Sequence, residues 1–248
     1  MPPRAPALLF LLACTPPAPQ RDPSPADARV KQPPARPVAA PDAAPSALEL
    51  AMTEHYRDTL QIKAAVIDGE LQDTRAPARR LLRADDAVPG TWRPFVAANA
   101  DHAAALLAAR DRHAAAAAAA GLARTCGDCH AAHGVGPAFE PPHDTPASAP
   151  HAVHGHMQRH QWAADRMWEA LIDRSEYAWM AGAAALVDAP LARADLTQDV
   201  ELPDDVAALA AEVHALGARA GASVGWSARA GLYGELLATC AGCHRGGC

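Results

Sequence analysis

Two short motifs place two cysteines and a histidine at the same spacing. The first motif is Cys126-Gly127-Asp128-Cys129-His130, and the second is Cys240-Ala241-Gly242-Cys243-His244. Cys-x-x-Cys-His is typical of c-type haem attachment, in which both thiols add to the haem vinyl groups and the histidine ligates the iron. On a helix these three residues stand at i, i+3 and i+4 and share one face. We therefore predict two covalently bound haem c groups, each held within about one helical turn.

The motifs also assign the ligands. The predicted attachment residues are Cys126, Cys129, Cys240 and Cys243, and the predicted proximal iron ligands are His130 and His244. The same cysteine pairs could instead bind zinc, as two Cys₂His sets or as one Cys₄ site. Export of the chain and the pairing of the motifs favour haem. No acid–base pair or nucleophile stands out beside the motifs, so we expect an electron carrier and no enzyme activity.

The N-terminus has the features of an export signal. Residues 1–14 carry one early positive charge, Arg4, and then a short apolar run over residues 7–13. This run is far below the roughly 20 residues that span a bilayer, and it suits a secretory signal. Its end resembles a bacterial lipobox in which Cys14 is lipidated, and ordinary signal-peptide cleavage is the alternative. Both predict a periplasmic or cell-surface location, and a lipid on Cys14 would anchor the chain to a membrane.

The residues that follow predict a spacer. Residues 15–45 are rich in proline and alanine, which is typical of an extended, semi-rigid segment. At about 3 Å per residue, this spacer would hold the remaining chain several nanometres from a membrane surface.

The remaining chain repeats itself. Met52 and His55 match Met157 and His160 at an offset of 105 residues, and the two cysteine–histidine motifs match at an offset of 114. The pattern predicts a first repeat over residues 46–131, a linker over 132–150 that is rich in glycine and proline, and a second repeat over 151–248.

Each repeat is predicted to contain four helices. The expected helices cover about 46–68, 73–86, 93–109 and 112–130, then 151–173, 175–188, 204–220 and 226–244. The break near 109–112 is inferred from Gly221, Ser223 and Gly225, which predict a turn at the matching place in the second repeat. No segment shows strand alternation. We predict an all-α fold of two tandem four-helix bundles, each ending in a haem motif.

This arrangement resembles the class II c-type cytochromes, the cytochrome c′ family of four-helix bundles. The resemblance covers residues 46–131 and 151–248, and its specific motifs are the two Cys-x-x-Cys-His sites. The family carries this motif near the C-terminus and places the distal residue on the first helix. Class I cytochromes c match poorly, because their motif stands near the domain start with a ligand downstream, whereas only four residues follow His244.

The distal side of each haem is expected to decide the mechanism. In an up-down-up-down bundle, the end of the fourth helix faces the start of the first. The distal candidates are therefore His55 and His160, which we favour, and then Met52 and Met157. Either ligand type would saturate the iron, methionine at higher potential. If none reaches the iron, the site is open and can bind a small gas. Four other histidines are further candidate ligands or propionate partners: His102, His154, His156 and His214.

Composition limits the partners. The net charge is −6 and no basic stripe is present, which argues against nucleic-acid binding. We expect redox partner proteins with a basic docking face, and the role of Cys248 stays open. The predicted function is one-electron transfer by a di-haem c-type cytochrome. The alternatives are a protein that binds NO or CO at an open distal site, and a haem peroxidase.

Overall fold

The computed structural model describes residues 44–83, 88–137, 139, 145–146, 153–187 and 204–245. All of them belong to one compact unit, Pro34–Cys248. The predicted signal and lipidation site at Cys14, nearly all of the predicted spacer, part of the predicted linker, and Cys248 lie outside the described residues.

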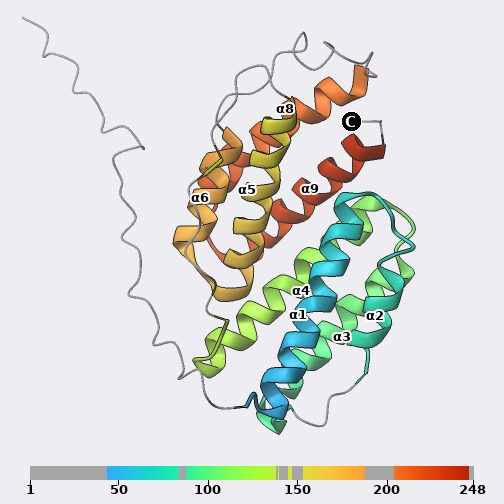
Figure 1. Cartoon of the computed structure of the whole chain (residues 1–248), viewed down its shortest axis with the longest axis vertical. Coiled ribbons are helices and arrows are strands. Elements are labelled where there is room, and N and C mark those ends of the chain that lie inside the picture. Colours follow the sequence, from blue (N-terminus) through green and yellow to red (C-terminus); the bar gives the residue numbers. More distant parts are fainter. Residues whose placement is uncertain are drawn as a thin grey trace, which may run out of the picture. The chain divides into compact units, whose positions relative to one another are not determined.

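The described residues form eight α-helices and one short 3₁₀ helix, with no strand among them, and they confirm the predicted all-α class. Figure 1 shows the helices in their chain order. Their bounds are α1 Ala47–Ile67, α2 Arg75–Leu81, the 3₁₀ helix Gly90–Trp92, α3 Arg93–Ala108, α4 Arg112–His133, α5 Val153–Asp173, α6 Glu176–Val187, α8 Asp204–Gly221 and α9 Trp226–Arg245.

Helix boundaries follow local chemistry. The Ser46 side chain accepts a hydrogen bond from the Glu49 backbone N–H at 3.2 Å, and the Glu49 carboxylate accepts one from the Ser46 N–H at 2.7 Å. This capping box starts α1. The predicted break between α3 and α4 is confirmed, because α3 ends at Ala108 and Asp111 caps α4 through the Ala114 N–H at 2.8 Å.

Two predicted helix ends differ from those of the structure. The helix expected over about 73–86 covers Arg75–Leu81; the next residue, Leu82, is 41% exposed, and residues 84–87 lie outside the described residues. The helix expected to end near residue 130 is longer than predicted. Helix α4 continues to His133 and stops at Gly134, whose left-handed backbone (φ 65°) closes the last turn.

Neighbouring helices in the chain pack against each other within each repeat. Helix α1 contacts α2 and α4, and α3 lies between α2 and α4; in the same way α5 contacts α6 and α9, and α8 lies between α6 and α9. The repeats also pack extensively on each other, chiefly through α4 against α9, with further contacts of α4 with α5 and of α1 with α9 (Figure 1).

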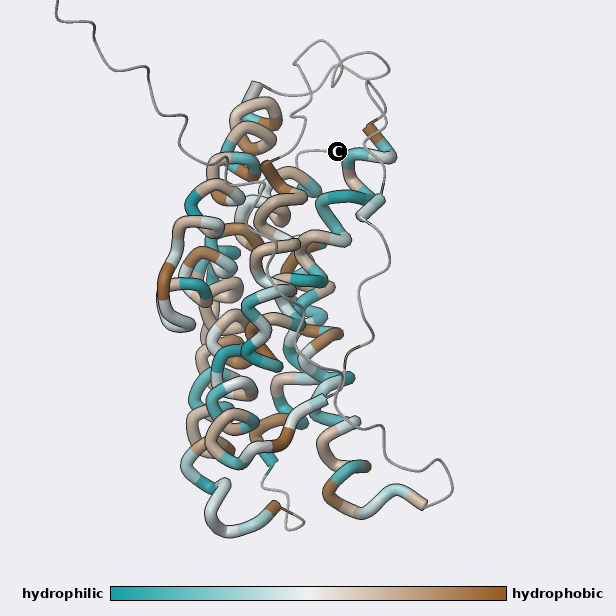
Figure 2. Tube along the Cα trace, turned by 90° about the vertical axis from the view of Figure 1, so that its left-hand side faces the viewer, coloured by the Kyte–Doolittle hydropathy of each residue, from teal (hydrophilic) through white to brown (hydrophobic). Residues whose placement is uncertain are grey.

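Small residues allow α4 and α9 to come close. A Cβ atom on Gly234 would lie only 3.3 Å from the Ala117 Cα, so the two backbones are nearly in contact there. Helix α4 buries mainly alanines, whereas the largest fully buried side chains, Trp168, Trp179 and Tyr233, come from the second repeat. Buried residues of both repeats form one continuous core, and Figure 2 shows hydrophobic positions distributed along all the helices.

The backbone has the same left-handed conformation after α1 and after α5. Gly69 follows α1 with φ 74°, and Arg174, at the matching position after α5, has φ 56°. A left-handed backbone is uncommon for a residue with a side chain, so its recurrence at the 105-residue offset shows that the two helices end in the same way. In the part of the chain described, no helix has the length and apolar character needed to cross a membrane.

Candidate cofactor site

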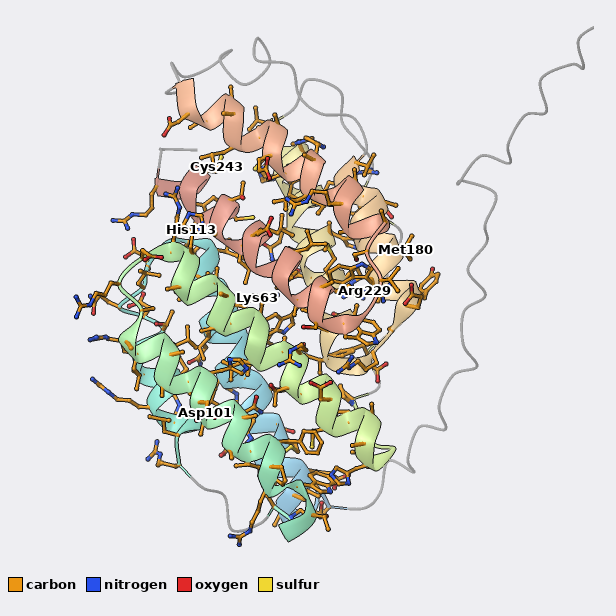
Figure 3. All side chains as sticks on the ribbon, turned by 180° about the vertical axis from the view of Figure 1, so that it is seen from behind. Lys63, Asp101, His113, Met180, Arg229 and Cys243 are labelled. Atoms are coloured by element: carbon orange, nitrogen blue, oxygen red, sulfur yellow. The ribbon has the colours of Figure 1, made fainter. Side chains whose placement is uncertain are left out.

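The second Cys-x-x-Cys-His motif borders a cavity of about 300 Å³. Cys240, Cys243 and His244 contribute to its wall from the last turns of α9, and Met157 and His160 contribute from the first half of α5. Figure 3 labels Cys243 near the C-terminal end of α9. The structure therefore brings together the predicted attachment residues, the proximal histidine and both distal candidates of the second repeat.

The rest of the cavity wall is mainly apolar. It includes Ile67 from the end of α1, Val153 and Ala164 from α5, and Val206, Ala210 and Val213 from α8. A concave, largely apolar space with a few convergent polar groups is the usual form of a cofactor site. Residue Ile67 belongs to the first repeat, so both repeats build this cavity.

His244 is held by the other repeat. Its Nδ1 lies 3.4 Å from Oδ1 of Asp68, the residue that ends α1. The His244 side chain is 39% exposed. Engagement of Nδ1 by a carboxylate leaves Nε2 available as a metal ligand, which is the usual arrangement of a ligating histidine and its orienting partner.

His130 in the first motif is held in the corresponding way. Its Nδ1 lies 2.9 Å from the backbone carbonyl oxygen of Ile172, one residue before the end of α5. Because a carbonyl only accepts, Nδ1 must carry the proton and Nε2 presents its lone pair. Ile172 and Asp173 stand at the end of α5 as Ile67 and Asp68 stand at the end of α1, 105 residues earlier. Each of the two histidines therefore contacts the end of the first helix of the other repeat.

Three of the four motif cysteines have raised thiol pKa values. Burial raises the pKa of the Cys126 thiol to about 11, although a hydrogen bond from the Asn99 amide, at 3.7 Å, opposes part of this shift. Burial raises the pKa of Cys240 to about 12 and also raises that of Cys129. These thiols are protonated at neutral pH, unlike the depressed-pKa thiols that serve as nucleophiles.

The structure does not gather the four motif cysteines in one place. The cavity beside Cys240 and Cys243 is lined by neither Cys126 nor Cys129. A single Cys₄ zinc site, one of the alternatives raised by the sequence, is therefore unsupported among the described residues.

The distal candidates of the first repeat are less closely tied to their motif. Met52 and His55 are half-buried on the second and third turns of α1, and Tyr56 packs on Phe139 at a ring distance of 5.8 Å. This ring contact places the middle of α1 beside the segment that follows α4, and α1 also packs on α4 itself. Within the described ranges, neither Met52 nor His55 has a hydrogen bond or ring contact to the first motif.

One group of residues was not recognised as a unit from the sequence. His156 and His160 of α5 and His214 of α8 have ring centroids 4.2 to 5.3 Å apart. The spacing His156-x-x-x-His160 places two of the rings on one helix face and was visible in the sequence. The third member comes from another helix, so only the fold could supply it.

The comparisons add no relatives. No protein-family model matches the chain, and no curated protein and no solved structure is significantly similar to it.

Proposed function

We propose that this chain is an exported di-haem c-type cytochrome that carries single electrons. The observation that carries this proposal is the cavity of about 300 Å³ where Cys240, Cys243 and His244 meet Met157 and His160. The proposal joins an attachment motif, a proximal histidine and a distal candidate at one mainly apolar space. A haem bound there would supply the one-electron chemistry, and the protein would tune its potential through the axial ligand and burial.

The residues present fit a covalently bound haem. Neutral cysteine thiols are the groups that would add to the vinyl substituents, and Cys126, Cys129, Cys240 and Cys243 would hold the two haems. His130 and His244 would be the proximal ligands, and their engaged Nδ1 atoms suit that role. The distal ligand is proposed to come from Met157 or His160 in the second repeat and from Met52 or His55 in the first.

We further propose that each repeat is a four-helix bundle derived by duplication. The packing of each first helix on its own last helix supports this, as do the matching left-handed residues Gly69 and Arg174. Because each proximal histidine contacts the other repeat, the two bundles would act as one rigid electron-transfer unit. Export and lipidation at Cys14 remain part of the proposal on the evidence of the sequence.

The first experiment is to express the full chain in a bacterium that matures c-type cytochromes and to count covalent haem by the pyridine haemochrome spectrum. Two haems per chain are expected. C126A/C129A and C240A/C243A should each retain one haem, and each double variant serves as the matched control for the other. Absence of covalent haem in the wild-type chain would overturn the proposal.

A second measurement separates an electron carrier from a gas-binding protein or a peroxidase. Both haems of a carrier should be six-coordinate. Adding carbon monoxide should therefore cause no change in the spectrum of the reduced protein during the first seconds. Rapid carbon monoxide binding at either haem would contradict the electron-carrier assignment for that haem and would favour one of the open-site alternatives.

A further inference from the structure

The three histidines His156, His160 and His214 converge in the interior beside α6. His156 is only 3% exposed, and the other two are half-buried. One ring nitrogen from each residue can be chosen so that all three lie within 4.8 Å of one another. The Nε2 atom of each ring is inaccessible to solvent and has no hydrogen-bond partner among the described residues. Three buried nitrogens without partners are costly unless something binds them.

The protonation of the cluster suits a metal. Burial, and then the mutual repulsion of the three rings with Arg159 nearby, lowers the pKa of His160 to about 3. Burial also lowers the pKa of His156 and of His214. The rings are therefore neutral at pH 7, and a neutral imidazole is the form that ligates a metal ion.

His214 has the orienting partner that a ligating histidine normally has. Its Nδ1 contacts the backbone carbonyl oxygen of Leu186, the next-to-last residue of α6. A carbonyl oxygen only accepts hydrogen bonds, so Nδ1 of His214 must carry the proton. The lone pair of His214 is therefore on Nε2, which faces the cluster.

The cluster is confined to the second repeat. The residue matching His160 in the first repeat is His55, and His102 falls at a similar place to His214, but the residue matching His156 is Ala51. Ala51 is buried, with 7% exposure, so an alanine fills that place in the first repeat without difficulty. Packing therefore does not require a histidine at position 156. His156 completes a set of three histidines, and this happens only in the second repeat.

We propose that His156, His160 and His214 form a site for a divalent transition-metal ion, distinct from the predicted haem irons. Three imidazoles suit Zn²⁺, and nitrogens up to 4.8 Å apart would have to close by about 1.4 Å to reach the roughly 3.4 Å between nitrogens of a tetrahedral zinc site. No carboxylate joins the set among the described residues, so the ion keeps its charge and takes water or a small anion as its fourth ligand.

A metal ion at this site would determine which residue can be the distal ligand of the second haem. His160 cannot ligate a metal in the cluster and the iron at the same time. Met157, three residues earlier on α5, lines the cavity beside Cys240 and Cys243 and remains for the iron. The inference therefore goes beyond the proposed electron carrier, and the zinc site does not depend on haem attachment.

The test measures Zn²⁺ binding to the full chain, with its haem content determined on the same sample. Isothermal titration calorimetry at pH 7.5 should show one equivalent bound in the micromolar range or tighter. H156A and H214A should each weaken binding at least tenfold. H156A restores the alanine of the first repeat, so it is expected to fold, and circular dichroism checks this. H113A, which replaces an exposed histidine of α4, is the control and should bind Zn²⁺ as the wild type does.

The outcomes separate this inference from the proposed function. No binding up to 100 μM Zn²⁺, or undiminished binding in H156A and H214A, would overturn the zinc site even where two haems are present. A changed haem spectrum in H160A, with no change in M157A, would also overturn it, because His160 would then be an iron ligand. In a chain with no covalent haem, zinc binding that is lost in H156A and H214A would support the site and contradict only the cytochrome proposal.

Discussion

Asp68 of the first repeat and His244 of the second repeat contact each other, with Oδ1 and Nδ1 3.4 Å apart. In the corresponding pair, His130 of the first repeat contacts the carbonyl oxygen of Ile172 of the second repeat. Each candidate proximal histidine is therefore oriented by the end of the first helix of the other repeat. Orienting partners of this kind tune the basicity of a ligating histidine and hence the properties of the metal.

Replacing Asp68 by asparagine tests this contact. In the proposed second haem the carboxylate would favour the oxidised, more positive iron, so D68N is expected to raise the reduction potential of that haem by a few tens of mV. That change is modest, about 1 kcal/mol or less, because the Asp68 side chain is 62% exposed and screened by solvent. Spectroelectrochemical titration of wild type and D68N measures it. The exposed Asp101 of α3 provides the control, D101N, and an equal shift in that variant would show a general charge effect.

The packing of α4 on α5 is tested by a glycine in the first motif. A Cβ atom on Gly127 would lie 2.0 Å from the Leu171 carbonyl oxygen and 2.9 Å from Nε of Arg174. G127A should therefore force the two helices apart and destabilise the protein by about 1–3 kcal/mol or more. Thermal unfolding followed by circular dichroism should show a lower Tm.

Gly231 of α9 is the matched control for that substitution. A Cβ atom there would meet nothing within 4 Å. G231A should leave the Tm unchanged or raise it, because alanine is favoured over glycine in a helix by about 1 kcal/mol. Equal loss of stability in both variants would contradict the close contact between the repeats.

Glu169 predicts a pH dependence of stability. Burial raises its pKa to about 7; the neighbouring charges of Arg166 and Lys63 oppose the shift and Asp165 adds to it. The folded state therefore binds the proton more tightly than the unfolded state does. The contribution of Glu169 is fully present below pH 4.5, its ordinary pKa, and is lost as the pH rises to about 7.

E169Q should remove this contribution. Denaturant unfolding at pH 5 and pH 8 should show a difference in the free energy of unfolding that is about 1–2 kcal/mol smaller in E169Q than in wild type, after allowance for screening. E235Q on α9 is a suitable control because Glu235 is exposed. An identical pH profile in wild type and E169Q would show that Glu169 keeps its ordinary pKa.

Met157 and His160 are distinguished by carbon monoxide. If Met157 is the distal ligand of the second haem, M157A should open that iron, and one of the two reduced haems should bind carbon monoxide within seconds. H160A should leave the spectrum unchanged and should lose Zn²⁺ binding. M52A reports on the first haem in the same assay. If the reduced M157A variant binds no carbon monoxide, Met157 is not the distal ligand.

The sequence by itself determined the helices and the chemistry they carry. Ser46, Asp111 and Gly134 mark helix ends through local hydrogen bonds and backbone conformation, which depend only on near neighbours in the chain. The all-α class was predicted from the absence of strand alternation, and the break between α3 and α4 from the turn residues Gly221, Ser223 and Gly225 of the second repeat. The spacing of Cys126, Cys129 and His130 was sufficient to predict a shared helix face, and the same holds for the second motif.

Only the tertiary structure decided which residues meet across the repeats. The sequence suggested two bundles in tandem, and nothing in it indicated that His130 would contact Ile172 or that His244 would contact Asp68. Such pairs are set by the close packing of α4 on α9, which small residues such as Gly234 and Ala117 permit. The histidine cluster has the same origin, because His214 reaches His156 and His160 only when α8 packs on α6, which itself packs on α5. Local patterns specify a helix and its faces, but side chains more than 40 residues apart are brought together by the burial of apolar surface over the whole fold.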